Sequence, residues 1–406
     1  MGTRKTHTAR LAVSAGLVAA LAGGASLAPA VAFAVDELAQ EKAVDQGATV
    51  ESKAVTMVQG GGAAVQYDSI AAAIADAKPY DYKTNKEAYV ITLNDNHAED
   101  VSIPANTRIV IDLNGHTLSN ASGHTITNSS NKLEVKDSVG TGVVDNTSNG
   151  KAALYNDVKA TATLNGGSFT RSAEASTSDS DAGGNSYYVL KNYGTMIINK
   201  GVVVKFSDTN PGFYSSLVAN GWQDAIKAEA GTNGEPKPTD GAKKATLTIN
   251  DGSFTGGQIT VKNDDYGTLT IKGGAIAQPS EGRFAVYNNH IAKISGGNIS
   301  SRSSAVASRM IKDTGANEGS LTVESAAVIV SEAGNPVFLR DGAKATITGG
   351  SFEAKGGAVA IGINDDASNA VVSGGTYKGT TKVSNRGDVL VDRYGVVEKD
   401  GSLLWR

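Results

Sequence analysis

Two Asn-Asp-Asp triplets and one histidine are the residues of this chain whose types could do chemistry. The triplets are Asn263-Asp264-Asp265 and Asn364-Asp365-Asp366. Paired carboxylates cleave glycosidic bonds when they lie roughly 5–9.5 Å apart, and a His–Asp pair can move protons. Asp264, Asp265 and His290 are therefore the catalytic candidates. Asp264, Asp341 and Asp365 are the candidate ligands for a cation such as Ca²⁺, which prefers oxygen ligands.

These residues belong to a chain built from one recurring sequence motif. In each copy, a strand of alternating apolar and polar residues is followed by a glycine turn. The motif is clearest in Ala245 to Phe254, where Leu247 and Ile249 share one face of the strand and Phe254 follows the turn. It returns at Thr268 to Ile276, Ala292 to Ile299, Ala345 to Phe352 and Ala370 to Tyr377. Allowing for insertions, the turn glycines recur about every 22–29 residues, which is the period of a solenoid.

An asparagine row gives a second register at the same period. It comprises Asn156, Asn192, Asn263, Asn288 and Asn364, and Arg340 takes the place once. Asparagine bonds readily to local amides, and stacked asparagines can bond to one another. Because the units contain short alternating strands and no helix, we predict an all-β, parallel β-helix of about ten coils.

The two ends of the solenoid are expected to be capped. Tyr67 to Ala77 has helical spacing with Asp68 or Ser69 as N-cap, which indicates a short helix over the first coil. The segment 388–406 contains Asp400-Gly401 between two alternating runs, which predicts a β-hairpin over the last coil. The predicted domain is 63–406, with insertions at 171–186 and 207–243 and a flexible leader at 35–62.

The N-terminus is typical of an export signal. A basic start precedes an alanine-rich apolar run, and Ala32-Phe33-Ala34 predicts cleavage after Ala34. A membrane anchor is the alternative interpretation. We therefore expect a secreted or cell-surface protein with no membrane span after cleavage and no recognisable sorting motif. The net charge of −4 and the lack of a basic run argue against nucleic-acid binding, and the absence of cysteine excludes disulfides and thiolate metal sites.

The carboxylates have a second, structural interpretation. The two triplets are about four coils apart, roughly 19 Å at the spacing of stacked strands, which is too far for paired catalysis. Because Asp264 and Asp365 directly follow the asparagine row, both can simply be turn residues at one corner. His290 should stack one coil beyond Asp265, and it can equally be an exposed edge residue.

The long insertion offers a binding site instead. Phe213, Tyr214 and Trp222 lie there in a polar setting, and flat aromatic rings can stack on sugars. Alternatively, Leu217, Trp222 and Ile226 pack the loop onto the coils.

The repeat resembles the pectin-lyase-like right-handed parallel β-helix superfamily, and in particular adhesin-like exported surface proteins of Gram-positive gut bacteria. The stretches that carry the resemblance are Ile111 to Leu118, Asn165 to Thr170 and Val261 to Gly267. The resemblance implies a fold but not an activity, because such proteins range from polysaccharide lyases to structural stalks. The Gly-His-Gly and Arg-Ile-Lys signatures of the related hydrolases are missing. Arg283 resembles a lyase base but lacks a carboxylate cluster.

We therefore expect a non-catalytic interaction module without a required cofactor, which binds a glycan, a surface polymer, or a host or cell-wall protein. A polysaccharide lyase or glycoside hydrolase acting on an acidic polysaccharide is the first alternative. A structural stalk is the second.

Overall fold

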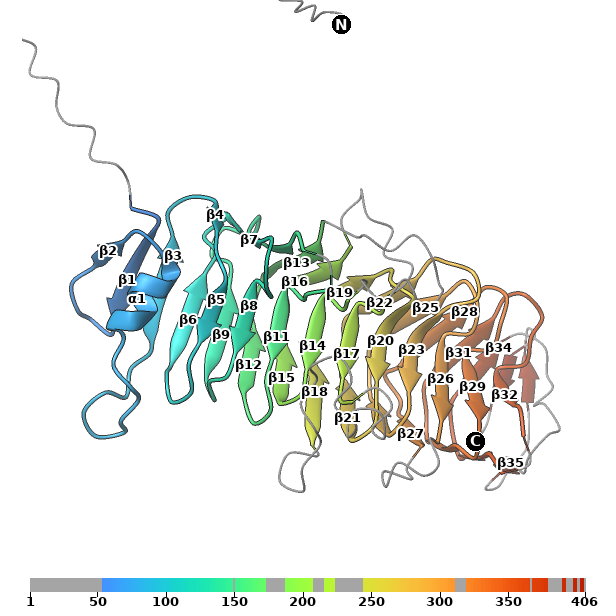
Figure 1. The fold of residues 1–406 in the computed structure, drawn as a ribbon. Helices are drawn as coiled ribbons and strands as arrows, with labels where there is room; N and C mark the ends of the chain where they lie inside the picture. The colour runs from blue at the N-terminus through green and yellow to red at the C-terminus, as the bar shows by residue number, and fades with distance from the viewer. Residues whose placement is uncertain are drawn as a thin grey trace, which may run out of the picture. The chain divides into compact units, whose positions relative to one another are not determined.

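The chain folds as a right-handed parallel β-helix, in which each coil contributes one strand to each of three sheets. The computed structural model describes residues 53–148, 150–172, 187–206, 215–222, 244–310, 319–365 and 367–378, with the backbone of three strands beyond them. The predicted signal peptide 1–34 lies outside the described residues. Figure 1 shows neighbouring strands of each sheet, such as β6, β9 and β12, coming from successive coils that follow one another from the helix α1 (Ile70–Asp76) onward.

Sheet 1 runs, in pairing order, through β2 (Val65–Tyr67), β1 (Val55–Gln59), β3 (Tyr89–Leu93), β6 (Ile109–Asp112), β9 (Leu133–Lys136), β12 (Thr161–Leu164), β15 (Thr195–Ile198), β18 (Ala245–Ile249), β21 (Gly267–Ile271), β24 (Ile291–Ile294), β27 (Ser320–Val323), β30 (Lys344–Ile347), β33 (Asn369–Val372) and β35 (Val389–Val391).

Sheet 2 runs through β4 (His97–Ala98), β7 (Thr117–Asn120), β10 (Val143–Asn146), β13 (Gly167–Arg171), β16 (Val202–Lys205), β19 (Ser253–Thr255), β22 (Ala275–Gln278), β25 (Asn298–Ser301), β28 (Val328–Ser331), β31 (Ser351–Ala354), β34 (Thr376–Lys378), β37 (Ser402–Leu404) and β36 (Val397–Lys399).

Sheet 3 runs through β5 (Val101–Ile103), β8 (Ile126–Asn128), β11 (Leu154–Asn156), β14 (Leu190–Asn192), β17 (Val218–Asn220), β20 (Ile259–Asn263), β23 (Phe284–Asn288), β26 (Val306–Arg309), β29 (Val337–Arg340) and β32 (Ile361–Ile363).

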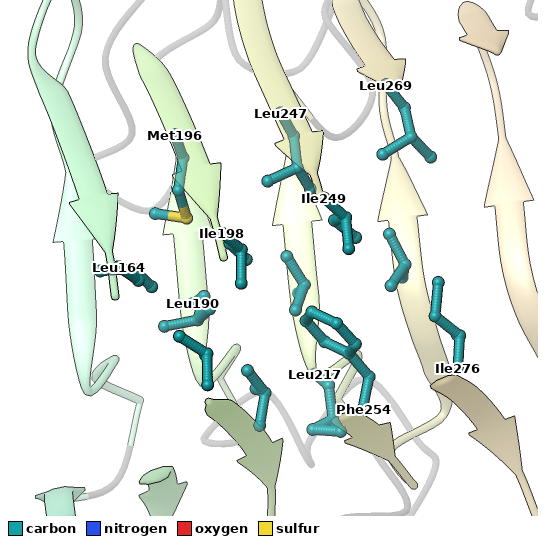
Figure 2. Packing of buried hydrophobic residues seen from close by; sticks show 14 of the residues in the cluster. Leu164, Leu190, Met196, Ile198, Leu217, Leu247, Ile249, Phe254, Leu269 and Ile276 are labelled. Atoms are coloured by element: carbon teal, nitrogen blue, oxygen red, sulfur yellow. The ribbon is translucent and has the colours of Figure 1, made fainter. Parts of the chain in front are cut away.

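The core lies between the three sheets and follows from strand alternation. Leu247 and Ile249 of β18 belong to one core cluster with Phe254 of β19 and Leu217, which precedes β17, and Figure 2 shows their side chains within this core. All four side chains are fully buried. Phe254 pairs in register with Val204 and Ile276, so apolar side chains stack from coil to coil. Full burial of each such side chain contributes about 1.5–3 kcal/mol.

The asparagine row forms a buried hydrogen-bonded ladder at the corner between sheets 3 and 1. Its members, one in each successive coil, are Asn128, Asn156, Asn192, Asn220, Asn263 and Asn288. Each side-chain amide donates to the carbonyl oxygen of the next at 2.7 to 2.8 Å, and Asn288 donates to Ser308 at 3.0 Å. The ladder therefore satisfies the amides of this buried corner without water.

The register corrects two members of the predicted row. Leu339 of β29 and Ile363 of β32 occupy the inward positions that continue the row beyond Ser308. Arg340 and Asn364 are each one residue later, and Asn364 is exposed. A shift of one residue turns a side chain to the other face of a strand. Both residues therefore lie outside the ladder.

The second predicted insertion is also corrected, because it contains a complete strand. β17 lies within 207–243 and pairs in parallel with β14 and β20. Val218 enters the core and Asn220 joins the ladder, so this segment supplies a regular coil. The parts of the insertions at 173–186, 207–214 and 223–243 lie outside the described residues.

The caps contain more strand structure than the sequence indicated. Ser69, one of the two predicted N-cap candidates, is the N-cap of α1, and its hydroxyl accepts a hydrogen bond from the Ala72 amide. β1 pairs antiparallel with β3, so Val55–Gln59 belongs to the fold and not to the predicted leader. At the other end β36 and β37 form the predicted antiparallel hairpin, and β37 pairs with β34 of the last coil.

Candidate functional site

The carboxylates singled out in the sequence lie along the corner where the strands of sheet 3 end. Asp264 and Asp265 follow β20, Asp341 follows β29, and Asp365 follows β32. β20 and β29 are three strands apart, so Asp264 lies about 14 Å along the coils from Asp341. The structure therefore does not bring the three predicted cation ligands together. Within the described residues, no three His, Asp or Glu side chains are placed to share a metal ion.

Asp264 is a buried carboxylate whose charge is already matched. Its Oδ1 atom lies 2.9 Å from Lys262 Nζ and accepts a hydrogen bond from Asn289 Nδ2 at 3.1 Å. The exposed fraction of its side chain is 1%. Asn289 Oδ1 in turn accepts a hydrogen bond from Arg309 Nε at 2.9 Å. These residues form a polar chain across three coils, Lys262–Asp264–Asn289–Arg309, in which the acid is held as an ion-pair partner.

Asp365 acts as a turn residue. Its Oδ1 atom accepts hydrogen bonds from the backbone amides of Ala367 and Ser368 at 3.0 and 2.9 Å, and its Oδ2 atom accepts one from the Ser368 hydroxyl. Burial alone would raise the pKa of this carboxyl, but the hydrogen bonds outweigh burial and lower the pKa below its ordinary value. Its neighbour Asp366 lies outside the described residues.

Asp341 lies in the turn that follows β29. Its backbone has a positive φ of 56°, and its side chain pairs with Arg340 Nε at 2.8 Å. Both partners are more than a third exposed, so this pair contributes little to stability.

His290 lies one coil beyond Asp265, as the ladder pairing of Asn263 with Asn288 requires. Its ring nitrogen Nδ1 lies 3.0 Å from the Gly267 carbonyl oxygen, and its ring packs 6.2 Å from that of Tyr266. Because a carbonyl only accepts hydrogen bonds, Nδ1 carries the hydrogen in this contact. Asp265 is fully buried and its backbone bridges to Trp222. These contacts fit a structural role for both residues.

Trp222 is buried and does not offer a face to a ligand. Its exposed fraction is 0%, and its ring packs between Tyr193, 5.0 Å away, and Tyr266, 6.4 Å away. Of the two interpretations of Trp222, this burial agrees with packing onto the coils and not with stacking on a sugar. The proposed partners Phe213 and Tyr214 lie outside the described residues.

A different set of aromatic and cationic side chains lies on the outer face of sheet 3, and we call it the sheet 3 face. Its members are Phe284, Tyr287, Arg309, Phe338 and Arg340. Tyr287, Ala307 and Phe338 share one register position on adjacent strands, and Arg309 pairs with Arg340 at another. Tyr287, Arg309, Phe338 and Arg340 alternate with residues that face inward, such as Val286 and Val337, so strand alternation could have identified these four. Phe284 has the same parity as Val286 and joins the set only through its contact with Tyr287.

The rings and guanidinium groups of the sheet 3 face contact one another. The Phe284 and Tyr287 ring centroids are 5.2 Å apart, and Arg309 Cζ lies 5.4 Å from the Tyr287 ring centroid. Burial raises the pKa of the Tyr287 hydroxyl, so this group stays protonated at neutral pH. Phe284 and Phe338 are half-buried and Tyr287 is 8% exposed, so the ring surface that a ligand could reach belongs mainly to the two phenylalanines, beside hydrogen-bond donors and positive charge. Such a surface binds sugars and anions by stacking and charge-assisted hydrogen bonds.

The three sheets and the asparagine corner define the chain as a parallel β-helix protein. Comparison with protein-family models, curated protein sequences and solved structures finds no match. The described part of the chain contains no helix with the length and apolar character of a membrane span.

Proposed function

We propose that this protein is an exported surface interaction module that binds a glycan or a related cell-surface polymer without catalysis. The observation that carries the proposal is the sheet 3 face, where Arg309 stacks near Tyr287 and beside the Phe284–Tyr287 ring pair. The C–H face of a sugar ring is apolar and packs on aromatic rings, while guanidinium groups donate to hydroxyl and carboxylate oxygens.

The polar chain favours binding over catalysis. A general base needs a lone pair that the substrate can reach, but the Asp264 side chain is 1% exposed and its Oδ1 atom is paired with Lys262. Arg309 is oriented by Asn289, which suits a group that holds a ligand in place.

The test is a glycan array and a set of soluble polysaccharides, probed with the full chain and with Arg309→Ala. We expect binding that weakens at least tenfold in the variant, with no change in the ultraviolet absorbance that unsaturated lyase products would cause. Arg302→Ala is the matched control, because Arg302 is exposed and forms a surface ion pair with Glu281.

Three outcomes would contradict the proposal. Release of sugar products, with or without Ca²⁺, would favour the polysaccharide lyase or hydrolase alternative. Equal binding by the wild type and Arg309→Ala would remove the sheet 3 face from the proposal. Lack of any glycan binding would favour a structural stalk.

A further inference from the structure

An amine, a carboxylate and an amide meet at the corner where the strands of sheet 3 end. The Oδ1 atom of Asp264 lies 2.9 Å from Lys262 Nζ and accepts a hydrogen bond from Asn289 Nδ2 at 3.1 Å. The amine and the amide come from adjacent coils, because Lys262 on β20 pairs with Tyr287 on β23, and Asn289 directly follows β23. One carboxylate oxygen therefore lies within hydrogen-bond distance of two side chains that can react with each other.

This cluster is nearly closed to solvent. Asn289 is 2% exposed, and the Asp264 side chain is 1% exposed. The Oδ2 atom of Asp264 is buried and has no hydrogen-bond partner among the described residues. The acid therefore has capacity for a proton that its resting contacts do not use. Because water is excluded, it does not compete with the amine for the carbon atom of the amide.

The Asn289 amide is held at both ends. Arg309 Nε donates to its Oδ1 atom at 2.9 Å, while its Nδ2 atom donates to Asp264. A guanidinium only donates and a carboxylate only accepts, so these two contacts fix which end of the amide is the oxygen. A cation at this oxygen stabilises the negative charge that develops there when a nucleophile adds to the amide carbon. The amide is thus polarised at its oxygen, while its nitrogen faces an acid.

We propose that Lys262 and Asn289 join in an intramolecular isopeptide bond, with Asp264 as the acid–base catalyst and ammonia as the leaving group. Lys262 passes a proton to Asp264 Oδ1, and the neutral amine attacks Cγ of Asn289. The carbonyl electron pair moves to Oδ1, which Arg309 holds. As the Cγ–Nδ2 bond breaks, Asp264 gives its proton to Nδ2. It then transfers the second proton from Nζ to the departing ammonia, which leaves as ammonium, so no further reactant is consumed.

The bond ties two adjacent coils covalently in a chain that has no cysteine for a disulfide. A cross-link of this kind stabilises a fold by restricting the unfolded chain. Before the bond forms, the ion pair with Lys262 alone matches the charge of Asp264. The bond is independent of the proposed function, because only the protein's own side chains react.

The test is the mass of the purified full chain, followed by a tryptic peptide map. We expect the intact protein to be lighter by one ammonia than the sequence it contains. Trypsin does not cut after a lysine whose amine is acylated, so the map should contain residues 245–272 joined to residues 284–293. Fragmentation of this joined peptide should place the link between Lys262 and Asn289.

Two variants should lose the bond and keep the mass that their sequences predict. Lys262→Arg retains the positive charge beside Asp264 but offers a guanidinium, which stays protonated and does not attack the amide. Asp264→Asn retains the size of the side chain but cannot carry protons between the reacting atoms. Lys293→Arg is the matched control and should form the bond as the wild type does, because Lys293 pairs with Glu324 at an exposed position.

The wild-type mass and peptide map decide the outcome even where a variant fails to fold. A wild type that keeps its full sequence mass and releases residues 245–262 and 284–293 separately would overturn the bond. Loss of ammonia without the joined peptide would indicate a cyclic imide at an asparagine, and this result overturns the bond as well. A bond formed to the same extent in Asp264→Asn would overturn the role of Asp264. The glycan array tests the proposed function separately, because its readout is binding and not mass.

Discussion

The ammonium group of Lys262 lies 2.9 Å from the carboxylate of Asp264, on a corner where the acid is 1% exposed. The two residues are separated by Asn263, a member of the buried ladder. Both therefore point outward from the strand end while the residue between them points inward. The pair turns the most attractive catalytic candidate of the sequence into a neutralised structural unit, which positions Asn289 and, through it, Arg309.

Replacement of Lys262 by methionine should destabilise the protein strongly. The change keeps the length of the side chain but leaves the Asp264 carboxylate buried without its cation, which costs about 3–5 kcal/mol. The midpoint of urea denaturation measures the loss. Lys262→Met/Asp264→Leu should recover most of the stability, because no unpaired charge remains. If Lys262→Met is as stable as the wild type, the Lys262–Asp264 pair does not stabilise the fold.

Asn220→Ala should interrupt the ladder at its centre. The change removes one acceptor of the Asn192 amide, which still donates to the Thr246 carbonyl oxygen. It leaves the Asn263 side-chain carbonyl without its donor, and such an unsatisfied buried group costs about 1–3 kcal/mol. Thermal unfolding followed by circular dichroism measures the effect. Asn364→Ala is the control, since Asn364 is exposed and its replacement should change the free energy of unfolding by less than about 0.5 kcal/mol.

Trp222→Ala should reduce stability and leave glycan binding intact. Removing a fully buried ring from between Tyr193 and Tyr266 costs about 3–5 kcal/mol. Trp222→Phe should cost less, because it keeps most of the packing. Denaturation midpoints and binding titrations at a temperature where both variants are folded distinguish the two roles. Weakened binding by fully folded Trp222→Phe would restore Trp222 as a ligand contact.

His124 should make stability depend on pH below neutrality. Burial, together with the charges of Lys151 and Arg171, lowers its pKa from 6.5 to about 4. Its Nδ1 atom accepts the Ala152 amide hydrogen at 2.8 Å, a contact that only the unprotonated nitrogen can make. The unfolded chain therefore binds a proton at higher pH than the folded chain does. The contribution of His124 to stability should fall by about 3 kcal/mol in total as the pH drops from about 6.5 to about 4. Above pH 6.5 this contribution should stay constant.

The measurement compares the denaturation midpoints of the wild type and His124→Gln across this pH range. Glutamine can still accept the Ala152 amide but does not titrate, so its curve should lack the histidine component. Parallel curves for the two proteins would show that His124 is not the group responsible.

Regular repetition made most of the fold predictable from the sequence. The turn after Ile249 and its equivalents, the alternation of Leu247 and Ile249, and the recurrence of asparagine all express one coil. A local pattern of this kind suffices because each coil contacts only its neighbours. The N-cap Ser69 and the C-terminal hairpin were predictable for a similar reason, since both depend on residues close in sequence.

The choice between neighbouring positions required the tertiary structure. Counting back from the glycine turns placed Arg340 and Asn364 in the ladder, but Leu339 and Ile363 take those inward positions. The count varied by two residues, and a shift of one residue reverses the face of a strand. β17 was missed in the sequence because long segments on both sides of it obscured its period. Val218 and Asn220 nevertheless occupy the regular positions of a coil.

The sequence by itself determined the coil, its period and the kind of residue at each corner, because these follow from local alternation and turn chemistry. Only the tertiary structure decided which outward side chains meet. Lys262 reaches Asp264, Trp222 is enclosed by Tyr193 and Tyr266, and Arg309 reaches Asn289. Such contacts depend on how successive coils are stacked in register, and that register is fixed by the packing of the whole core.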